Sequence, residues 1–166
     1  MQTATQPPVP KLDGTGLRIG IVVARYNWHI TGAMLQLAQE ELRCLGVEDI
    51  CVVSTPGSYE LATTAKAMLT GDAYDALICF GCVMKGETRH DVVVSDAAAQ
   101  GIQRVALEMG VPIIFGVMCV ENQQQAEARI PRGKECAEAA VEMARTVQML
   151  RRAKQAKEQA DVHRDR

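Results

Sequence analysis

The sequence is poor in aromatic residues and carries no large excess of charge of either sign. Phe, Trp and Tyr make up 4% of the 166 residues, and the formal net charge is −2. A nearly balanced chain creates no overall field that attracts nucleic acid or an anionic membrane. We therefore predict neither of these partners, and any anion would have to be bound by a local group of side chains.

Long apolar runs are also missing. None of the apolar stretches approaches the roughly 20 residues needed to span a bilayer. The N-terminal segment MQTATQPPVPKLDG lacks the basic and then apolar pattern of a secretory signal, so we expect a cytoplasmic location. The six cysteines are scattered through apolar segments, which is typical of buried reduced thiols rather than of a disulfide framework.

Motifs for nucleotides and metals are absent as well. GTGLRIG precedes a predicted strand instead of following one, which argues against a dinucleotide site, and no Walker A pattern occurs. Cys79 and Cys82 form a C-x-x-C, but residues three apart in a strand point to opposite faces. Redox or zinc chemistry is the weaker alternative, because no second pair or clustered histidine completes a site. We expect no cofactor and no metal.

What the sequence does contain is a regular alternation of two patterns. Four short apolar or β-branched runs predict strands over 17–24, 49–54, 76–82 and 112–118. Helical patterns predict helices over 31–45, 58–70, 95–109, 122–129 and 134–158. This alternation predicts an α/β fold, a three-layer α/β/α sandwich around a central four-stranded parallel sheet. We expect a flexible N-terminal arm over 1–16, one domain over 17–152 and a polar helical tail over 153–166.

Ligands of open α/β sheets bind beyond the carboxyl ends of the strands. This rule selects the segments that follow the four predicted strands, RYNWHITG, TPGSYE, VMKGETRH and CVENQQ. In the first, Tyr26 could stack on a planar heterocycle or simply pack. In the second, Gly57 and Glu60 could receive a polyol or a pyrimidine edge. Alternatively, Ser58 caps a helix whose first turn holds Glu60.

The third segment, KGETRH, has the ingredients of a phosphate site: a glycine turn, a hydroxyl, cations and the N-terminus of a helix. His90 at its end could act as a general acid/base, because imidazole titrates near neutral pH. The alternative is a charged surface loop. Further along, Arg129 lies between two predicted helices, where a guanidinium suits a phosphate but also suits a solvated connector.

Taken together and in this order, these segments resemble the lumazine synthase family. The resemblance runs from about Gly14 to Leu150 and rests on LRIGIVVARYN, STPGSYE, YDALICFGCVMKGETRH, GVPIIFGV, the pattern EN–Q–A–AR, and AAVEMA. It implies a flavodoxin-like fold and a transferase of riboflavin biosynthesis. That enzyme condenses 5-amino-6-(D-ribitylamino)uracil with 3,4-dihydroxy-2-butanone 4-phosphate to 6,7-dimethyl-8-ribityllumazine, phosphate and water. These steps need positioning and proton transfer rather than a cofactor.

The resemblance also implies roles for individual residues. Tyr26 matches the aromatic that stacks on the pyrimidine, and His90 matches the residue that transfers protons. Glu87 and Thr88 fall where the family receives the phosphate-bearing substrate. The positions that match the binding site for the uracil ring and its ribityl chain are Ser58, Tyr59, Glu60, Cys82, Val83 and Met84.

An assembly is implied as well. Phe115 and Arg129 match residues that a neighbouring subunit contributes, Arg129 at the phosphate, so a homo-oligomer is expected. Relatives form pentamers, sometimes built into an icosahedral shell of about 60 subunits. A neighbour can add an extra N-terminal strand to the sheet, and riboflavin synthase is a further candidate partner. Two alternatives on the same scaffold are an archaeal-type riboflavin synthase and a non-catalytic shell or flavin-binding protein; His90 and Arg129 favour the synthase.

Three departures from the family pattern occur in this chain. One is the polar helical tail after Leu150, which is longer than usual and has no assigned role. His90 is followed by DVVV where the family has aromatic and acidic residues, and the loop after Arg129 is shortened to RIPRGKE. The packing around His90 is therefore expected to differ, and Lys134 receives no role in the site.

Overall fold

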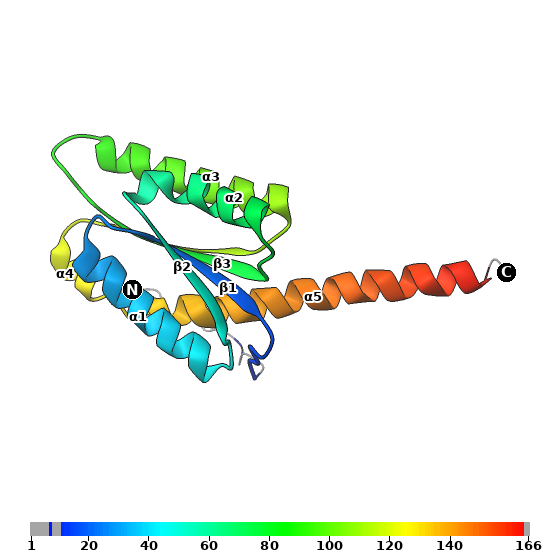
Figure 1. Cartoon of the computed structure of the whole chain (residues 1–166). Coiled ribbons are helices and arrows are strands. Elements are labelled where there is room, and N and C mark those ends of the chain that lie inside the picture. Colours follow the sequence, from blue (N-terminus) through cyan, green and yellow to red (C-terminus); the bar gives the residue numbers. More distant parts are fainter. Residues whose placement is uncertain (1–6, 8–10, 165–166) are drawn as a thin grey trace.

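The computed structural model describes residue 7 and residues 11–164, in which strands and helices alternate (Figure 1). All four strands are parallel and lie in the order β2-β1-β3-β4. The predicted α/β/α sandwich with a flavodoxin-like arrangement is confirmed. The elements are β1 (Arg18–Ala24), α1 (Trp28–Cys44), β2 (Asp49–Thr55), the short 3₁₀ helix η1 (Ser58–Glu60), α2 (Leu61–Gly71), β3 (Ala76–Met84), α3 (His90–Met109), β4 (Ile113–Val120), α4 (Gln123–Glu127) and α5 (Arg132–Arg164).

The hydrophobic core forms one layer on each face of the sheet. Helices α1 and α5 cover one face, and α2 with α3 covers the other (Figure 1). Strands covered on both faces need apolar side chains at successive positions, which explains the continuous apolar runs in the sequence. Cys79 and Cys82 belong to different layers, so the prediction that their side chains point to opposite faces is confirmed. Burial raises the pKa of the Cys79 thiol to about 12, which keeps it protonated.

Helix α3 begins at His90, whereas the sequence pattern predicted a start at residue 95. The β-branched run Val92–Val94 lowers helix propensity by at most a few tenths of a kcal/mol per residue, so tertiary packing can override it. Val94 is half-buried and faces a cavity at the end of the sheet. Because α3 begins earlier than predicted, His90 lies in the first turn of this helix.

Helix α5 is longer than predicted and extends past the sheet (Figure 1). Its first half packs into the core through Ala137, Ala140, Val141 and Ala144, whereas all residues from 149 to 164 are exposed. The residues that the structure describes include no helix long and apolar enough to cross a membrane.

The predicted arm falls largely on residues 1–6 and 8–10, which lie outside the described residues, as does any strand that they might lend to a neighbour. Its described part, residues 11–16, packs onto the domain. The N–H of Gly14 donates to Leu45 O at 2.7 Å. Arg145 in α5 donates from Nε to Asp13 O at 2.8 Å and from Nη2 to Thr15 O at 2.6 Å. These bonds fix the path of the chain into β1.

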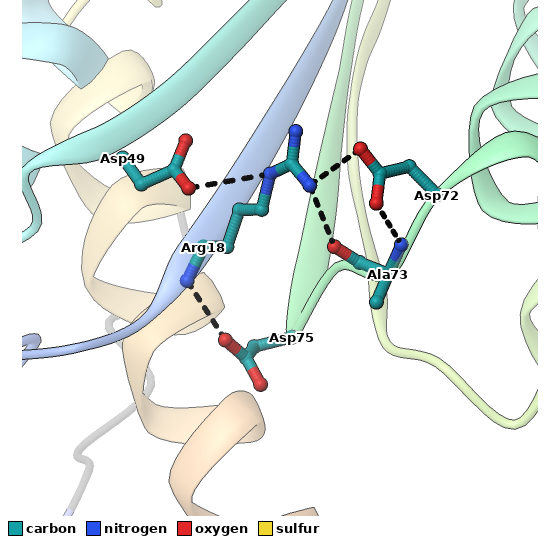
Figure 2. Close-up of polar contacts among 5 residues, drawn as sticks. All are labelled: Arg18, Asp49, Asp72, Ala73 and Asp75. Atoms are coloured by element: carbon teal, nitrogen blue, oxygen red, sulfur yellow. Dashed lines mark hydrogen bonds and ion pairs between the residues drawn. The ribbon is translucent and has the colours of Figure 1, made fainter.

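At the amino ends of the strands, Arg18 holds neighbouring segments together (Figure 2). Its Nη1 lies 2.6 Å from Asp72 Oδ2 and donates to Ala73 O at 3.4 Å, while its Nε lies 3.3 Å from Asp49 Oδ2. The backbone N–H of Arg18 donates to Asp75 Oδ2 at 2.7 Å. Because these partners belong to β2 and to the connection before β3, one residue of β1 ties three strand starts together.

We expect the Arg18 contacts to make stability depend on pH in the acid range. Bonds from the Ala73 N–H and from Arg18 hold the pKa of Asp72 below its ordinary value of 3.8. A carboxyl group with a lowered pKa stabilises the fold above about pH 4, and the stabilisation is lost as pH falls through the folded-state pKa. Arg18→Gln should therefore lower the urea midpoint at neutral pH, and this deficit should narrow in acid.

The measurement is urea unfolding, followed by far-UV circular dichroism, at a series of pH values from neutral to acid. Lys154→Gln is the matched control, because the Lys154–Glu158 pair, 3.8 Å apart, lies on the exposed part of α5 and should contribute almost nothing. A deficit in Arg18→Gln that stays constant down to acid pH would contradict a role for Asp72.

Candidate active site at the carboxyl ends of the strands

A cavity of about 360 Å³ opens at the carboxyl ends of β1 and β3. Three of the four segments selected from the sequence form its walls; the fourth, which follows β4, is absent from the lining. The cavity contains the predicted catalytic residue, His90, and predicted binding residues from all three segments. The lining residues are Tyr26, Asn27, Ser58, Cys82, Val83, Met84, Gly86, Thr88, His90, Asp91 and Val94.

Tyr26 occupies the turn between β1 and α1 and is 72% exposed. Its backbone N–H donates to Pro56 O at 3.2 Å, which joins this turn to the segment after β2. A Cβ atom built on Gly57 would lie 3.0 Å from Tyr26 Cδ2, so the ring lies directly against Gly57. A flat ring that lines a cavity and leaves much of its surface open is suited to stacking on a planar ligand.

The segment after β2 folds differently from the predicted helix cap. Ser58 does not cap a helix from outside; it is the first residue of η1 and is buried. Gly57 precedes η1, and its N–H donates to Glu60 Oε2 at 3.0 Å. Glu60 thus closes its own turn, while Tyr59 is exposed, and neither side chain lines the cavity. The Ser58 side chain occupies the space next to Gly81. A methyl group on residue 81 would overlap Ser58 Oγ, so this packing requires glycine there.

The floor of the cavity is the end of β3, formed by Cys82, Val83 and Met84. Burial, and then the nearby Cys119, raise the pKa of the Cys82 thiol. The thiol is therefore protonated at neutral pH, and this wall of the cavity is uncharged and largely apolar. Such a surface suits the face of an aromatic heterocycle better than it suits a phosphate.

The opposite wall is the N-terminus of α3. Thr88 Oγ1 accepts from the His90 N–H at 3.4 Å, and the Val93 N–H donates to Arg89 O at 3.2 Å. The first amides of a helix have no partners within it and favour negative charge. Gly86 leaves open space beside them, since among the described residues no atom other than those of Gly86 and its two chain neighbours lies within 4 Å of a Cβ built there. This wall can receive an anion next to the His90 imidazole.

Several predicted residues lie away from the cavity. Phe115, 37% exposed on β4, instead lines a separate groove along the first turns of α5. Arg129 is exposed and donates from Nη1 to Gln125 O at 3.0 Å. Glu87 is exposed in the loop before α3 but does not line the cavity. One copy of the chain therefore leaves Phe115 and Arg129 outside the cavity that holds His90.

Lining residues for which the sequence pattern predicted no role are Asn27, Asp91 and Val94, whereas Gly86 belongs to the predicted glycine turn. Asp91 contributes the only carboxylate among the lining residues, and it became part of the wall because α3 begins at His90. Lys85 has a different place: its Nζ lies 3.0 Å from Glu121 Oε2, which pins the end of β3 to the segment after β4. Among the described residues, no three or more His, Cys, Asp or Glu side chains are grouped to hold a metal ion.

These features define a flavodoxin-like α/β protein with a cavity at the carboxyl ends of its strands. A family model described as 6,7-dimethyl-8-ribityllumazine synthase matches residues 16–148. The chain belongs to the 6,7-dimethyl-8-ribityllumazine synthase family, and the resemblance inferred from its motifs is confirmed.

Relatives of the same name come from distant organisms. The protein from Cupriavidus necator is 44% identical over 142 residues, covering 84% of this chain and 86% of the relative. The one from Bordetella petrii is 45% identical over 144 residues, covering 85% and 82%. The protein from Thermococcus gammatolerans is 44% identical over 135 residues, covering 79% and 88%. The similarity spans the sheet, the cavity and most of the helices.

Proposed function

We propose that this protein is a transferase of riboflavin biosynthesis that makes 6,7-dimethyl-8-ribityllumazine. Its substrates are 5-amino-6-(D-ribitylamino)uracil and 3,4-dihydroxy-2-butanone 4-phosphate, and phosphate and water leave. The observation that carries the proposal is the cavity itself, which unites Tyr26, Ser58, Cys82 and His90 from separate parts of a chain of this family.

The uracil half of the reaction suits the apolar side of the cavity. Tyr26 stacks on the pyrimidine ring, and Cys82, Val83 and Met84 form the floor beneath it. The ribityl chain extends toward the turn after β2, where Ser58, Tyr59 and Glu60 provide hydroxyl, carboxylate and backbone groups. Moving the uracil ring from water to a position between an aromatic side chain and a neutral floor costs little free energy, because the ring carries no net charge.

The phosphate-bearing substrate suits the other wall. Glu87 and Thr88 receive it beside the N-terminus of α3, where amides without a partner inside the helix favour an anion. There the primary amino group of the uracil attacks the ketone and water leaves to form an imine. Loss of a proton from the neighbouring carbon then expels phosphate with the electron pair of its C–O bond. The ribitylamino nitrogen attacks the remaining carbonyl, and loss of a second water closes the ring. His90 transfers the protons that these steps require. It accepts them from the attacking nitrogen and donates them to the oxygen that leaves as water. Positioning of the two substrates supplies the rest of the acceleration.

A neighbouring subunit completes the site in this proposal. Phe115 and Arg129 lie outside the cavity of their own chain and belong in that of an adjacent copy, Arg129 at the phosphate. The protein is therefore a homo-oligomer, and a pentamer satisfies this head-to-tail contact by closing into a ring. Residues 17–152 form the catalytic domain.

The test of the proposed reaction uses the purified oligomer and both substrates, with lumazine absorbance and phosphate release recorded together. We expect both signals to rise in step and faster than the spontaneous condensation. Folded protein that gives no acceleration would sink the proposal. Conversion of added lumazine to riboflavin, without butanone phosphate, would instead indicate a riboflavin synthase.

We expect two inactive variants to restore each other when their subunits are mixed. His90→Ala and Arg129→Ala should each lose activity alone, Arg129→Ala chiefly through a raised KM for the phosphate-bearing substrate. After unfolding and refolding of an equal mixture, about a quarter of the sites in the mixed rings combine an intact His90 with an intact Arg129. Activity near that fraction of wild type is the expected result. No recovery from a mixture that has assembled would mean that both residues act within one chain.

A further inference from the structure

The sheet ends unevenly on the side of the cavity. β1 pairs with β3 as far as Val23 opposite Phe80, and β1 stops at Ala24, whereas β3 continues to Met84. The carbonyl of Cys82 therefore lies beyond the last backbone partner that β1 offers. Cys82 also lines the cavity. Because β4 pairs with β3 as far as Val120 opposite Met84, the edge of β3 without a strand partner at the floor of the site is the one toward β1.

A side chain takes the place of the missing strand pairing. Asn27 Nδ2 donates to Cys82 O at 2.8 Å, in a partly buried position, across the gap between the first turn and β3. The bond joins residues 55 positions apart in the chain. Asn27 itself lines the cavity and directly follows Tyr26. A partly buried bond of this kind stabilises the fold, and losing the donor leaves the Cys82 carbonyl unsatisfied.

The backbone of Asn27 is also unusual. Its φ of 58° and ψ of 45° are left-handed, and no other non-glycine residue in the described part of the chain has a positive φ. Asparagine tolerates this conformation better than most residues. The conformation still costs free energy, which contacts in the surrounding structure must offset. Here the Ile30 and Thr31 amides both donate to Asn27 O, at 2.9 and 3.1 Å, so the conformation starts α1.

We propose that Asn27 is a positioning residue for the reaction, which fixes the Tyr26 ring over the β3 floor by bridging the two strand ends. This inference rests on the proposed function, because it assigns Asn27 to the same cavity. The side chain sets the separation between the turn that carries Tyr26 and the strand that carries Cys82. Without it, the two surfaces that enclose the pyrimidine can move apart although each remains intact.

Three variants separate the side chain from the backbone. Asn27→Gly accepts the left-handed backbone and removes the bridge, and Asn27→Asp tolerates that backbone but presents a carboxylate to a carbonyl. Asn27→Ala loses both features. If the bridge acts, Gly and Asp variants should each raise the KM for the aminouracil about tenfold and change the KM for butanone phosphate much less. Wild-type KM values in Asn27→Gly and Asn27→Asp, with a raised KM for the aminouracil only in Asn27→Ala, would overturn the proposal.

A control for general loosening of the turn is Thr31→Val. Thr31 Oγ1 donates to Ala24 O at 2.8 Å in a buried position, so this isosteric change weakens the same turn without touching Cys82. We expect a lower melting temperature with the KM for the aminouracil within about twofold of wild type. A tenfold rise of the KM for the aminouracil in Thr31→Val would mean that any weakening of the turn has the same effect as loss of the bridge. That result would overturn the specific role of Asn27.

A second measurement does not depend on turnover. Trp28 is the only tryptophan of the chain, follows Asn27 directly and is half exposed, so its fluorescence reports this turn. Asn27→Gly and Asn27→Asp should increase acrylamide quenching of Trp28 by about a factor of two if the bridge holds the turn. Wild-type protein without synthase activity would count against the proposed function. In that case unchanged quenching in both variants would overturn the bridge as well, and increased quenching would support it.

Discussion

Replacing Gly133 with alanine is expected to lower the free energy of unfolding by about 2 kcal/mol. Gly133 lies in the first turn of α5, and a Cβ atom there would lie 2.5 Å from Met34 O and 2.9 Å from Met34 Cα. Both atoms belong to the backbone of α1, so no side chain can rotate away and the two helices must separate. Overpacking of this kind costs about 3 kcal/mol, and the higher helix propensity of alanine returns at most about 1 kcal/mol.

The measurement is thermal unfolding, in which a loss of this size corresponds to a fall in Tm of about 4–8 °C for a chain of this length. Gly71→Ala is the matched control, because Gly71 ends α2 and a Cβ there has no tertiary neighbour within 4 Å in the described part of the chain. That variant should be neutral or slightly stabilised. Equal melting temperatures for the two variants would mean that α1 and α5 can adjust without loss of packing.

Gly81→Ala is expected to reduce kcat/KM by about 10- to 100-fold while the protein still folds. The new methyl group would overlap Ser58 Oγ and come within 3.2 Å of Ser58 Cβ. Because Ser58 is only 6% exposed, its side chain has little room to turn elsewhere. The hydroxyl that lines the cavity is therefore displaced, and the turn that carries Tyr59 and Glu60 moves with it.

A double variant tests this cause. Ser58→Gly makes room for the methyl group, so Gly81→Ala combined with Ser58→Gly should regain the melting temperature of Ser58→Gly alone. Its activity should also equal that of Ser58→Gly, since the hydroxyl is absent in both. Full wild-type activity in Gly81→Ala would contradict the placement of Ser58. Activity in the double variant below that of Ser58→Gly would mean that Gly81 acts by another route.

The sheet could be predicted from the sequence because both of its faces are buried. Continuous apolar runs such as ALICFG are typical of strands covered on both faces, and the order of strands and helices limits the topology. The ends of the helices were less predictable. The β-branched run Val92–Val94 hid the start of α3, because Val92 and Val93 are exposed and the buried face of the helix appears only at Ala98, Ile102 and Val105.

The residues of the candidate site could also be predicted only in part from the sequence. Segments at the carboxyl ends of strands pointed to Tyr26, Cys82 and His90, and these meet in the cavity. Asn27 escaped prediction because its role depends on an unequal length of two strands. The available signal was an asparagine between a strand and a helix, since few other residues accept a left-handed turn. Phe115 and Arg129 cannot be placed by one chain, because their proposed site belongs to two.

The position of Arg18 has a consequence for how this protein can change. Arg18 is the first of the seven residues of β1, and the strand from Arg18 to Ala24, just before the turn that holds Tyr26, spans roughly 20 Å at the usual rise. Substitutions that strengthen or weaken the fold at the amino ends of the strands therefore act far from the reacting groups. Loops at the carboxyl ends can be redesigned for another heterocycle, while stability lost there is restored at the opposite end of the same strands.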